Sequence, residues 1–240
     1  SYITYSTQSD VVSGGTFSGV YDIVIAKLDN SGEPVWLRQS PSYNTVEADS
    51  WPSIALGPDL SVYVAFTTAG TISGGYSYVD KDGSKNADVA VLKLDASGQF
   101  QWAQQRTSFN TAANETSPKI SVDSCGNCYV AYHTQSAAIP GSYPGDDVVM
   151  FKLDNSGSFM WAIQGAPINT ESVESSPSIA VSADGLVHIA YYTDGTVSSG
   201  SRGISPDIVV ARLHQLPPRA LRTVAADIVM DGTVVCNKAV

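Results

Sequence analysis

The sequence has few charged side chains, and basic ones are the scarcest. Lysine, arginine, aspartate and glutamate make up 15% of its 240 residues, against about 25% in average globular proteins. Thirteen basic against 23 acidic residues give a formal net charge of −10. Nucleic acids and anionic membranes are bound through basic surfaces, so we expect neither as a partner. Hydrophobic residues still make up 43%, which excludes a disordered chain.

Long apolar runs are missing as well. None approaches the roughly 20 residues that a membrane-spanning helix needs, so we expect no membrane insertion. The chain opens on Ser1-Tyr-Ile-Thr-Tyr-Ser, without an initiator methionine or a signal-like start, and we expect a processed protein or a fragment. The low charge and the many serine, threonine, glycine and asparagine residues suit an extracellular protein or one on the surface of a particle.

Cysteine is rare, with three residues in the chain. Cys125 and Cys128 form a C-x-x-C motif in a tight turn between strands. Zinc would need a second pair or suitably spaced histidines, and a redox motif would need a helix N-terminus that lowers a thiol pKa. Two interpretations remain: a local disulfide between these two cysteines, or two free thiols. Cys236 has no assigned partner.

One segment of about 60 residues recurs along the chain. Its clearest part begins at an aspartate and runs through apolar residues to a lysine or arginine. It occurs at 22–28, 88–94, 147–153 and 207–213. A near-constant period is typical of a repeat architecture. We call a position that recurs across the repeats a column.

Each repeat divides into four short stretches that are rich in β-branched and aromatic residues, which favour strands. In the second repeat the strands are predicted at 53–56, 61–68, 88–94 and 100–105. The turn between the third and fourth strands is Asp-x-Ser-Gly in three repeats, at 29–32, 95–98 and 154–157. Aspartate can cap such a turn, and glycine accepts the positive φ at its end. With no helical periodicity, the sequence predicts an all-β fold.

The third strand of each repeat decides between all-β architectures. A sandwich strand with one wet face should alternate apolar and polar residues. The third strands, such as Val89–Leu92 and Val148–Phe151, are instead almost continuously apolar. Blades stacked around an axis cover both faces of each sheet, so the sequence predicts a β-propeller of four-stranded antiparallel blades.

A composite pattern summarises the repeats: S-I-A-V-x-x-D-G-x-V-x-x-A-Y-x-T, followed by D-x-V-V-x-K-L-D-x-S-G-x-x-x-W. It resembles the bacterial-type β-propeller repeat family that is usually described as seven-bladed. The resemblance covers approximately residues 1–214. It implies a propeller fold and no particular activity, because a fold does not determine a function.

We interpret the chain as a single propeller domain of four units, with a closing strand and tail at its end. The units are 1–45, 46–110, 111–169 and 170–225, followed by 226–240. Tyr2–Thr7 aligns with Tyr63–Thr68, so the first unit lacks its first strand. We predict that residues 226–231 supply this strand and close a four-bladed ring. The alternative is an open arc, either part of a larger propeller or a subunit whose neighbour covers the edge.

Further columns lie in the loop before each first strand. Asn-Thr recurs at 44–45, 110–111 and 169–170, after Tyr43, Phe109 or Ile168, and an acid follows as Asp49, Glu115 and Glu174. One interpretation is a ligand-binding ring for a cation or a glycan, which would include Trp51 in a loop. In the other, the asparagine caps its own turn and the acid accepts loop N–H groups. The tryptophan column, Trp36, Trp102 and Trp161, is expected to pack blade on blade.

Two charged columns border the third strand. An aspartate opens it (Asp22, Asp88, Asp147, Asp207) and a basic residue lies near its end (Lys27, Lys93, Lys152, Arg212). A catalytic lysine would not recur in every unit. We therefore predict ion pairs between blades, which fix register more than they stabilise.

The second unit carries an insertion at 78–88 whose oxygen-bearing side chains could bind a metal ion. They are Asp80, Asp82, Asn86 and Asp88. Calcium prefers such ligands, but the spacing differs from that of an EF-hand loop. The alternative is a solvated loop. We expect no cofactor, with calcium at this loop as the one exception to test.

No nucleophile elbow, phosphate-binding loop or metalloprotease motif occurs in the sequence. The favoured function is therefore non-catalytic: a structural or adhesive interaction module that binds a partner protein or neighbouring copies of the same chain. The second hypothesis is a carbohydrate-binding propeller. The weakest is a hydrolase or lyase at the channel mouth, because the residues that break the repeat form no acid–base pair.

Overall fold

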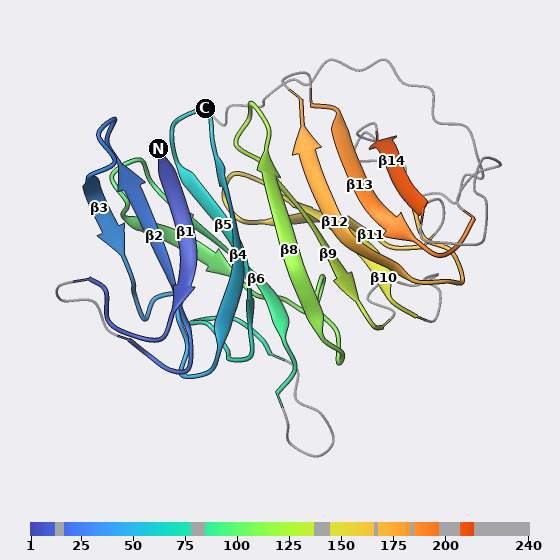
Figure 1. The fold of residues 1–240 in the computed structure, drawn as a ribbon, viewed down its shortest axis with the longest axis horizontal. Coiled ribbons are helices and arrows are strands. Elements are labelled where there is room, and N and C mark those ends of the chain that lie inside the picture. The colour runs from blue at the N-terminus through green and yellow to red at the C-terminus, as the bar shows by residue number, and fades with distance from the viewer. Residues whose placement is uncertain are drawn as a thin grey trace.

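The computed structural model describes residues 1–12, 17–77, 85–136, 145–165, 168–182, 185–196 and 207–213. Over these residues the regular elements are all β-strands, as predicted. The strands form four separate antiparallel sheets, which follow one another along the longest axis of the molecule (Figure 1). We call these sheets blades 1 to 4 in chain order.

Every blade is a meander, in which consecutive strands pair. Blade 2 contains β4 (Asp49–Leu56), β5 (Val62–Thr68), β6 (Asp88–Leu94) and β7 (Phe100–Gln104). Blade 3 contains β8 (Glu115–Val122), β9 (Cys128–Thr134), β10 (Asp147–Leu153) and β11 (Phe159–Ile163). Within the described residues, blade 1 contains β1 (Tyr2–Thr7), β2 (Asp22–Leu28) and β3 (Pro34–Arg38). Blade 4 contains β12 (Glu174–Val181), β13 (Val187–Thr193) and β14 (Asp207–Leu213).

The middle strands of blades 2 and 3 are buried on both faces because another blade packs on each side. All residues of β5, β6 and β10 are buried. Tyr63 and Val91 of blade 2 belong to the core shared with blade 3. Val64 and Leu92, on the opposite face, belong to the core shared with blade 1. This two-sided packing explains the nearly continuous apolar strands and confirms the propeller-type fold.

The strands that open blades 2, 3 and 4 begin at 49, 115 and 174, earlier than the predicted 53, 119 and 178, and contain a β-bulge. In each, the residue before a proline has a positive φ: 57° at Trp51, 55° at Ser117 and 53° at Ser176. The register with the neighbouring strand shifts at the same place. Because proline cannot donate to a sheet ladder, a bulge is where a strand can hold one.

Tryptophan and glycine join successive blades. A Cβ atom added at Gly98 of blade 2 would lie 2.9 Å from the ring of Trp36 in blade 1. One added at Gly157 of blade 3 would lie equally close to the ring of Trp102 in blade 2. The turn glycine of one blade therefore lies directly on the tryptophan of the blade before it. The predicted blade-on-blade packing of these tryptophans is confirmed.

Over the described residues the blades form an open row and not the four-bladed ring that we favoured. Successive blades contact one another, but β1–β3 make no substantial contact with the described strands of blade 4. The alternative prediction, an open arc, fits this arrangement (Figure 1). The predicted closing segment, 226–231, lies outside the described residues.

Candidate functional site

The asparagines of the loop columns hold the backbone of a strand in the preceding blade. The amide Oδ1 of Asn110 accepts a hydrogen bond from the Val89 N–H at 2.8 Å, and its Nδ2 donates to the Val89 carbonyl at 2.9 Å. Asn44 does the same with Ile23, and Asn169 with Val148. Each asparagine therefore binds the backbone of a residue 21 positions earlier in the chain. The prediction that it caps its own turn is wrong.

The three loop acids are fully buried and serve as internal hydrogen-bond acceptors. Asp49 accepts from the Thr45 N–H at 2.6 Å, and Glu174 accepts from the Thr170 N–H at 3.0 Å. Glu115 accepts from the hydroxyl of Thr111 in its own loop and from that of Thr134 in β9, the latter at 2.9 Å. The interpretation that these acids bind their own loops is confirmed. Burial raises the pKa of Asp49 to about 6 and the pKa of Glu115 to about 8.

The predicted ligand-binding ring does not come together. Tyr43 and Phe109 have exposed fractions of 1% and 0%, and Phe109 stacks on Phe151 with ring centroids 4.1 Å apart. Of the six candidate ligand residues, Trp51 alone reaches solvent, with 62% of its surface exposed. It lies in β4 and not in a loop, because the strand continues through the bulge.

The charged columns have different partners from those predicted. Asp22, Asp88 and Asp147 each accept a hydrogen bond from a glutamine 17 residues later, at 2.8 to 3.0 Å. Each lysine instead lies over a tyrosine near the start of the second strand, with Nζ 4.7 to 5.4 Å from the ring centroid. Lys152 also forms an ion pair with Asp123 of its own blade, at 3.8 Å. The sequence contained a signal for the pairing of aspartate with glutamine, since Gln39, Gln105 and Gln164 recur at the same spacing as the aspartates.

The candidate metal ligands of the insertion are only partly described. Asp80 and Asp82 lie outside the described residues. Asn86 is buried and donates to the Ala112 carbonyl, and Asp88 accepts from Gln105. In the described part of the chain, no group of three or more histidine, cysteine, aspartate or glutamate side chains could hold a metal ion. Calcium at this loop remains a prediction.

Both interpretations of the C-x-x-C motif, a disulfide between Cys125 and Cys128 and two free thiols, are wrong. Cys128 is a free thiol with no exposed surface, because it points into the core between blades 2 and 3. Burial raises the pKa of this thiol to about 12. Cys125 takes part in a disulfide, but not with Cys128. Cys236 lies outside the described residues.

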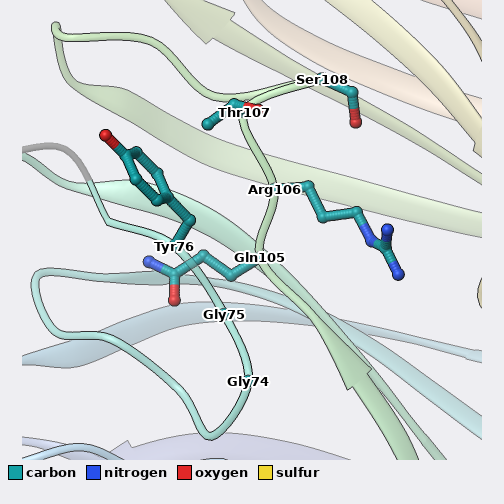
Figure 2. A pocket seen from close by; sticks show the side chains of 7 residues that line it. All are labelled: Gly74, Gly75, Tyr76, Gln105, Arg106, Thr107 and Ser108. Atoms are coloured by element: carbon teal, nitrogen blue, oxygen red, sulfur yellow. The ribbon is translucent and has the colours of Figure 1, made fainter.

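One shallow groove of about 410 Å³ lies on the loops of blade 2. It is lined by Gly74, Gly75, Tyr76, Gln105, Arg106, Thr107 and Ser108 (Figure 2). The Arg106 side chain extends away from that of Tyr76, so the two do not converge on one point. Sequence reasoning missed this groove. The available signal was Arg106, which replaces Ser40 and Gly165 of the same column.

No protein-family model matches the chain, and no curated protein matches it. Among solved structures, a Hadza microbial sialidase is similar with a TM-score of 0.49 and 12% identity, over 80% of this chain and 41% of that one. An ulvan lyase of polysaccharide lyase family 25, bound to -[GlcA(1-4)Rha3S]-, has a TM-score of 0.42 and 12% identity, over 72% and 46%. The chain spans less than half the length of either. Both neighbours are carbohydrate-active proteins, but likeness at this level supports no activity for this chain.

Within the described ranges, the chain contains no helix of the length and apolarity needed to cross a membrane.

Proposed function

We propose that the protein is a non-catalytic interaction module, structural or adhesive, that offers the sheet faces of its end blades to other protein surfaces. One observation carries the proposal. Ile208 and Val210 of β14 are 69% and 73% exposed, whereas their counterparts in blade 2, Val89 and Val91, are fully buried. Exposed apolar patches on a folded protein mark interaction sites.

The polar columns support a non-catalytic role because internal contacts occupy them. The aspartates accept from glutamines, the loop acids accept from threonines, and the asparagines bind strand backbone. Catalysis of hydrolysis or elimination needs acid and base groups that converge on an open pocket. The described groove of blade 2 contains one arginine and no carboxylate among its lining residues.

Dye binding tests whether the apolar face of blade 4 is accessible. We expect the dilute chain to enhance the fluorescence of the apolar dye ANS, and the double variant Ile208→Gln/Val210→Gln to lose most of the enhancement. Val46→Gln is the matched control, because Val46 is 70% exposed but lies in the loop before β4. Equal fluorescence from the wild type and the double variant would contradict the proposal.

Carbohydrate binding is the second candidate, and Trp51 is the observation that favours it. This exposed indole breaks the repeat at a position where the other bulges carry Ser117 and Ser176. Flat aromatic side chains offer a large, rigid contact surface with a polar edge. A glycan array tests this candidate with Trp51→Ser, which restores the residue type of the other blades. Binding that is lost in this variant supports the candidate, and an array without any bound glycan rejects it.

A further inference from the structure

The junction of blades 2 and 3 shows which contacts a turn with asparagine makes between blades. At the junction of blades 2 and 3, Tyr63 donates from its hydroxyl to Asn155 Oδ1 at 2.8 Å. Trp102 donates from Nε1 to the Asn155 carbonyl at 3.2 Å, and Lys93 donates to the Asn155 side chain. The turn Asp154-Asn155-Ser156-Gly157 of one blade therefore receives the tyrosine, lysine and tryptophan of the blade before it.

Blade 1 carries the same turn, but nothing in the described structure lies against it. The turn reads Asp29-Asn30-Ser31-Gly32, the same four residues as in blade 3. A Cβ added at Gly32 would meet no atom within 4 Å, in contrast to Gly98 and Gly157. We call this end of the molecule, the turn 29–32 together with β1, the head.

The outer face of β1 is also incomplete. Ile3 and Tyr5 are 42% and 37% exposed, whereas their counterparts on β5, Val64 and Phe66, are fully buried against the preceding blade. The middle of β2 is already covered, since Val24 and Ala26 are 0% and 2% exposed. The open surface of the head therefore consists of the β1 side and the β2–β3 turn.

The opposite end, which we call the tail, is the uncovered face of β13 and β14. Ile208, Val210 and Tyr192 are 69%, 73% and 48% exposed. The corresponding residues of blade 3 are Val148, Met150 and His133. Val148 and Met150 are fully buried. Arg212 is exposed in the column of Lys93, which contacts the Asn-Ser-Gly turn inside the molecule. The tail thus presents the apolar side chains and the cation that a preceding blade supplies at a junction inside the molecule. The head has no preceding blade.

We propose that the tail of one chain packs on the head of a second copy, with β14 against β1 and Arg212 near Asn30. This inference rests on the proposed function, because it names the partner of the exposed faces. The contact joins two different surfaces, so it is heterologous and yields either a closed ring or a filament. Two copies supply eight blades, which lies within the range of about four to eight that closed propellers typically use.

Sedimentation velocity of the full chain, with variants that block one end each, tests the orientation. Ile208→Lys/Val210→Lys blocks the tail and Ile3→Lys/Tyr5→Lys blocks the head, with Val46→Lys as the matched control. We expect the wild type and the control to associate as concentration rises, and each blocked variant to stay monomeric. A mixture of the two blocked variants should form a dimer, because one free head and one free tail remain.

A milder pair of variants guards against misfolding. Gly32→Asn tolerates the positive φ of the turn, since asparagine adopts it more readily than most residues, but fills the open space of the head. Arg212→Glu reverses the charge at the tail. Both should weaken association. At dilutions where the chain is monomeric, Arg212→Glu should leave the melting temperature unchanged, and Gly32→Asn should lower it by no more than Gly32→Ala does.

Three outcomes would overturn the inference. They are a wild type that stays monomeric at every concentration, a head-blocked variant that still associates, or a mixture that does not. The first result combined with ANS binding to the Ile208–Val210 face would reject the second copy as partner and leave the proposed function standing. Equal ANS fluorescence from the wild type and from Ile208→Gln/Val210→Gln would reject the proposed function itself.

Discussion

The asparagine that spans two blades offers the most direct test of how the repeat is held together. Asn110 is 2% exposed and binds both the N–H and the carbonyl of Val89, at 2.8 and 2.9 Å. Replacing it with alanine leaves both backbone groups buried, because Val89 is fully buried and lies in a closed core. Water cannot reach either group unless the loop opens.

The expected magnitude follows from two unsatisfied groups. Leaving one buried polar group without a partner costs about 1–3 kcal/mol. Two such groups give about 2–6 kcal/mol, and partial relaxation of the loop places our expectation near 3 kcal/mol. Such a loss is a large part of the stability of a typical domain, about 5–15 kcal/mol.

Urea unfolding followed by tryptophan fluorescence measures this loss. Asn110→Ala should shift the midpoint to lower urea with little change in the slope, since the surface exposed on unfolding is nearly the same. Asn30→Ala, in an exposed turn, is the control and should change the free energy of unfolding by less than about 0.5 kcal/mol. A loss below about 1 kcal/mol for Asn110→Ala would refute the reasoning, because water or another donor would then have replaced the amide.

Four further predictions follow from the packing and the titratable groups. Burial raises the folded pKa of Glu115 to about 8, above its usual 4.5, so the folded state binds the proton more tightly. The free energy of unfolding should therefore fall as pH rises from about 5 to 8, and Glu115→Gln should flatten this dependence in urea titrations while the exposed Glu171→Gln does not. Gly157→Ala should cost about 2–3 kcal/mol because its methyl group meets Trp102 and its φ is positive; Gly32→Ala, which lacks the clash, should cost about 1 kcal/mol, and equal losses would argue against the close contact. Trp51→Gly should raise the free energy of unfolding by about 1 kcal/mol, since glycine adopts the positive φ without strain, and a drop would mean that the indole makes contacts that matter. Cys128 should resist alkylation in the native chain and react on unfolding, because its buried thiol has a pKa of about 12; mass spectrometry that finds it labelled under native conditions would contradict its burial.

The strands and turns were predictable because their causes are local. The Asp-x-Ser-Gly turn satisfies its own backbone, as in Asp95, whose Oδ1 accepts from the N–H groups of Ser97 and Gln99. β6 and β10 match their predicted bounds. In blades 2, 3 and 4 the first strand extends further toward the N-terminus than predicted, across Pro52, Pro118 and Pro177, a residue type that ordinarily argues against a strand. A bulge accommodates these prolines, and periodicity alone does not reveal it.

The roles of the polar columns could not be read from spacing alone. A recurring acid next to an asparagine is compatible with a ligand site and with an internal hydrogen-bond network. Burial decides between the two. Glu115 and Glu174 are buried and accept hydrogen bonds from threonines of the second strand, which lie 19 residues later in the chain. The exposed faces at the two ends were equally hidden from sequence reasoning, because Ile208 and Val210 read like every other third-strand residue.

The contact between glycine and tryptophan has a consequence for how such chains can grow. Blades 1, 2 and 3 each carry both sides of this contact: a tryptophan ring that faces the following blade and an Asp-x-Ser-Gly turn that faces the preceding one. Duplication of one of these three blades could therefore lengthen the array without a new kind of contact, since the copy would carry the ring and the turn that its neighbours require. At the two ends of the described array, the turn of blade 1 and the sheet of blade 4 keep these surfaces exposed, so selection for or against self-association acts there.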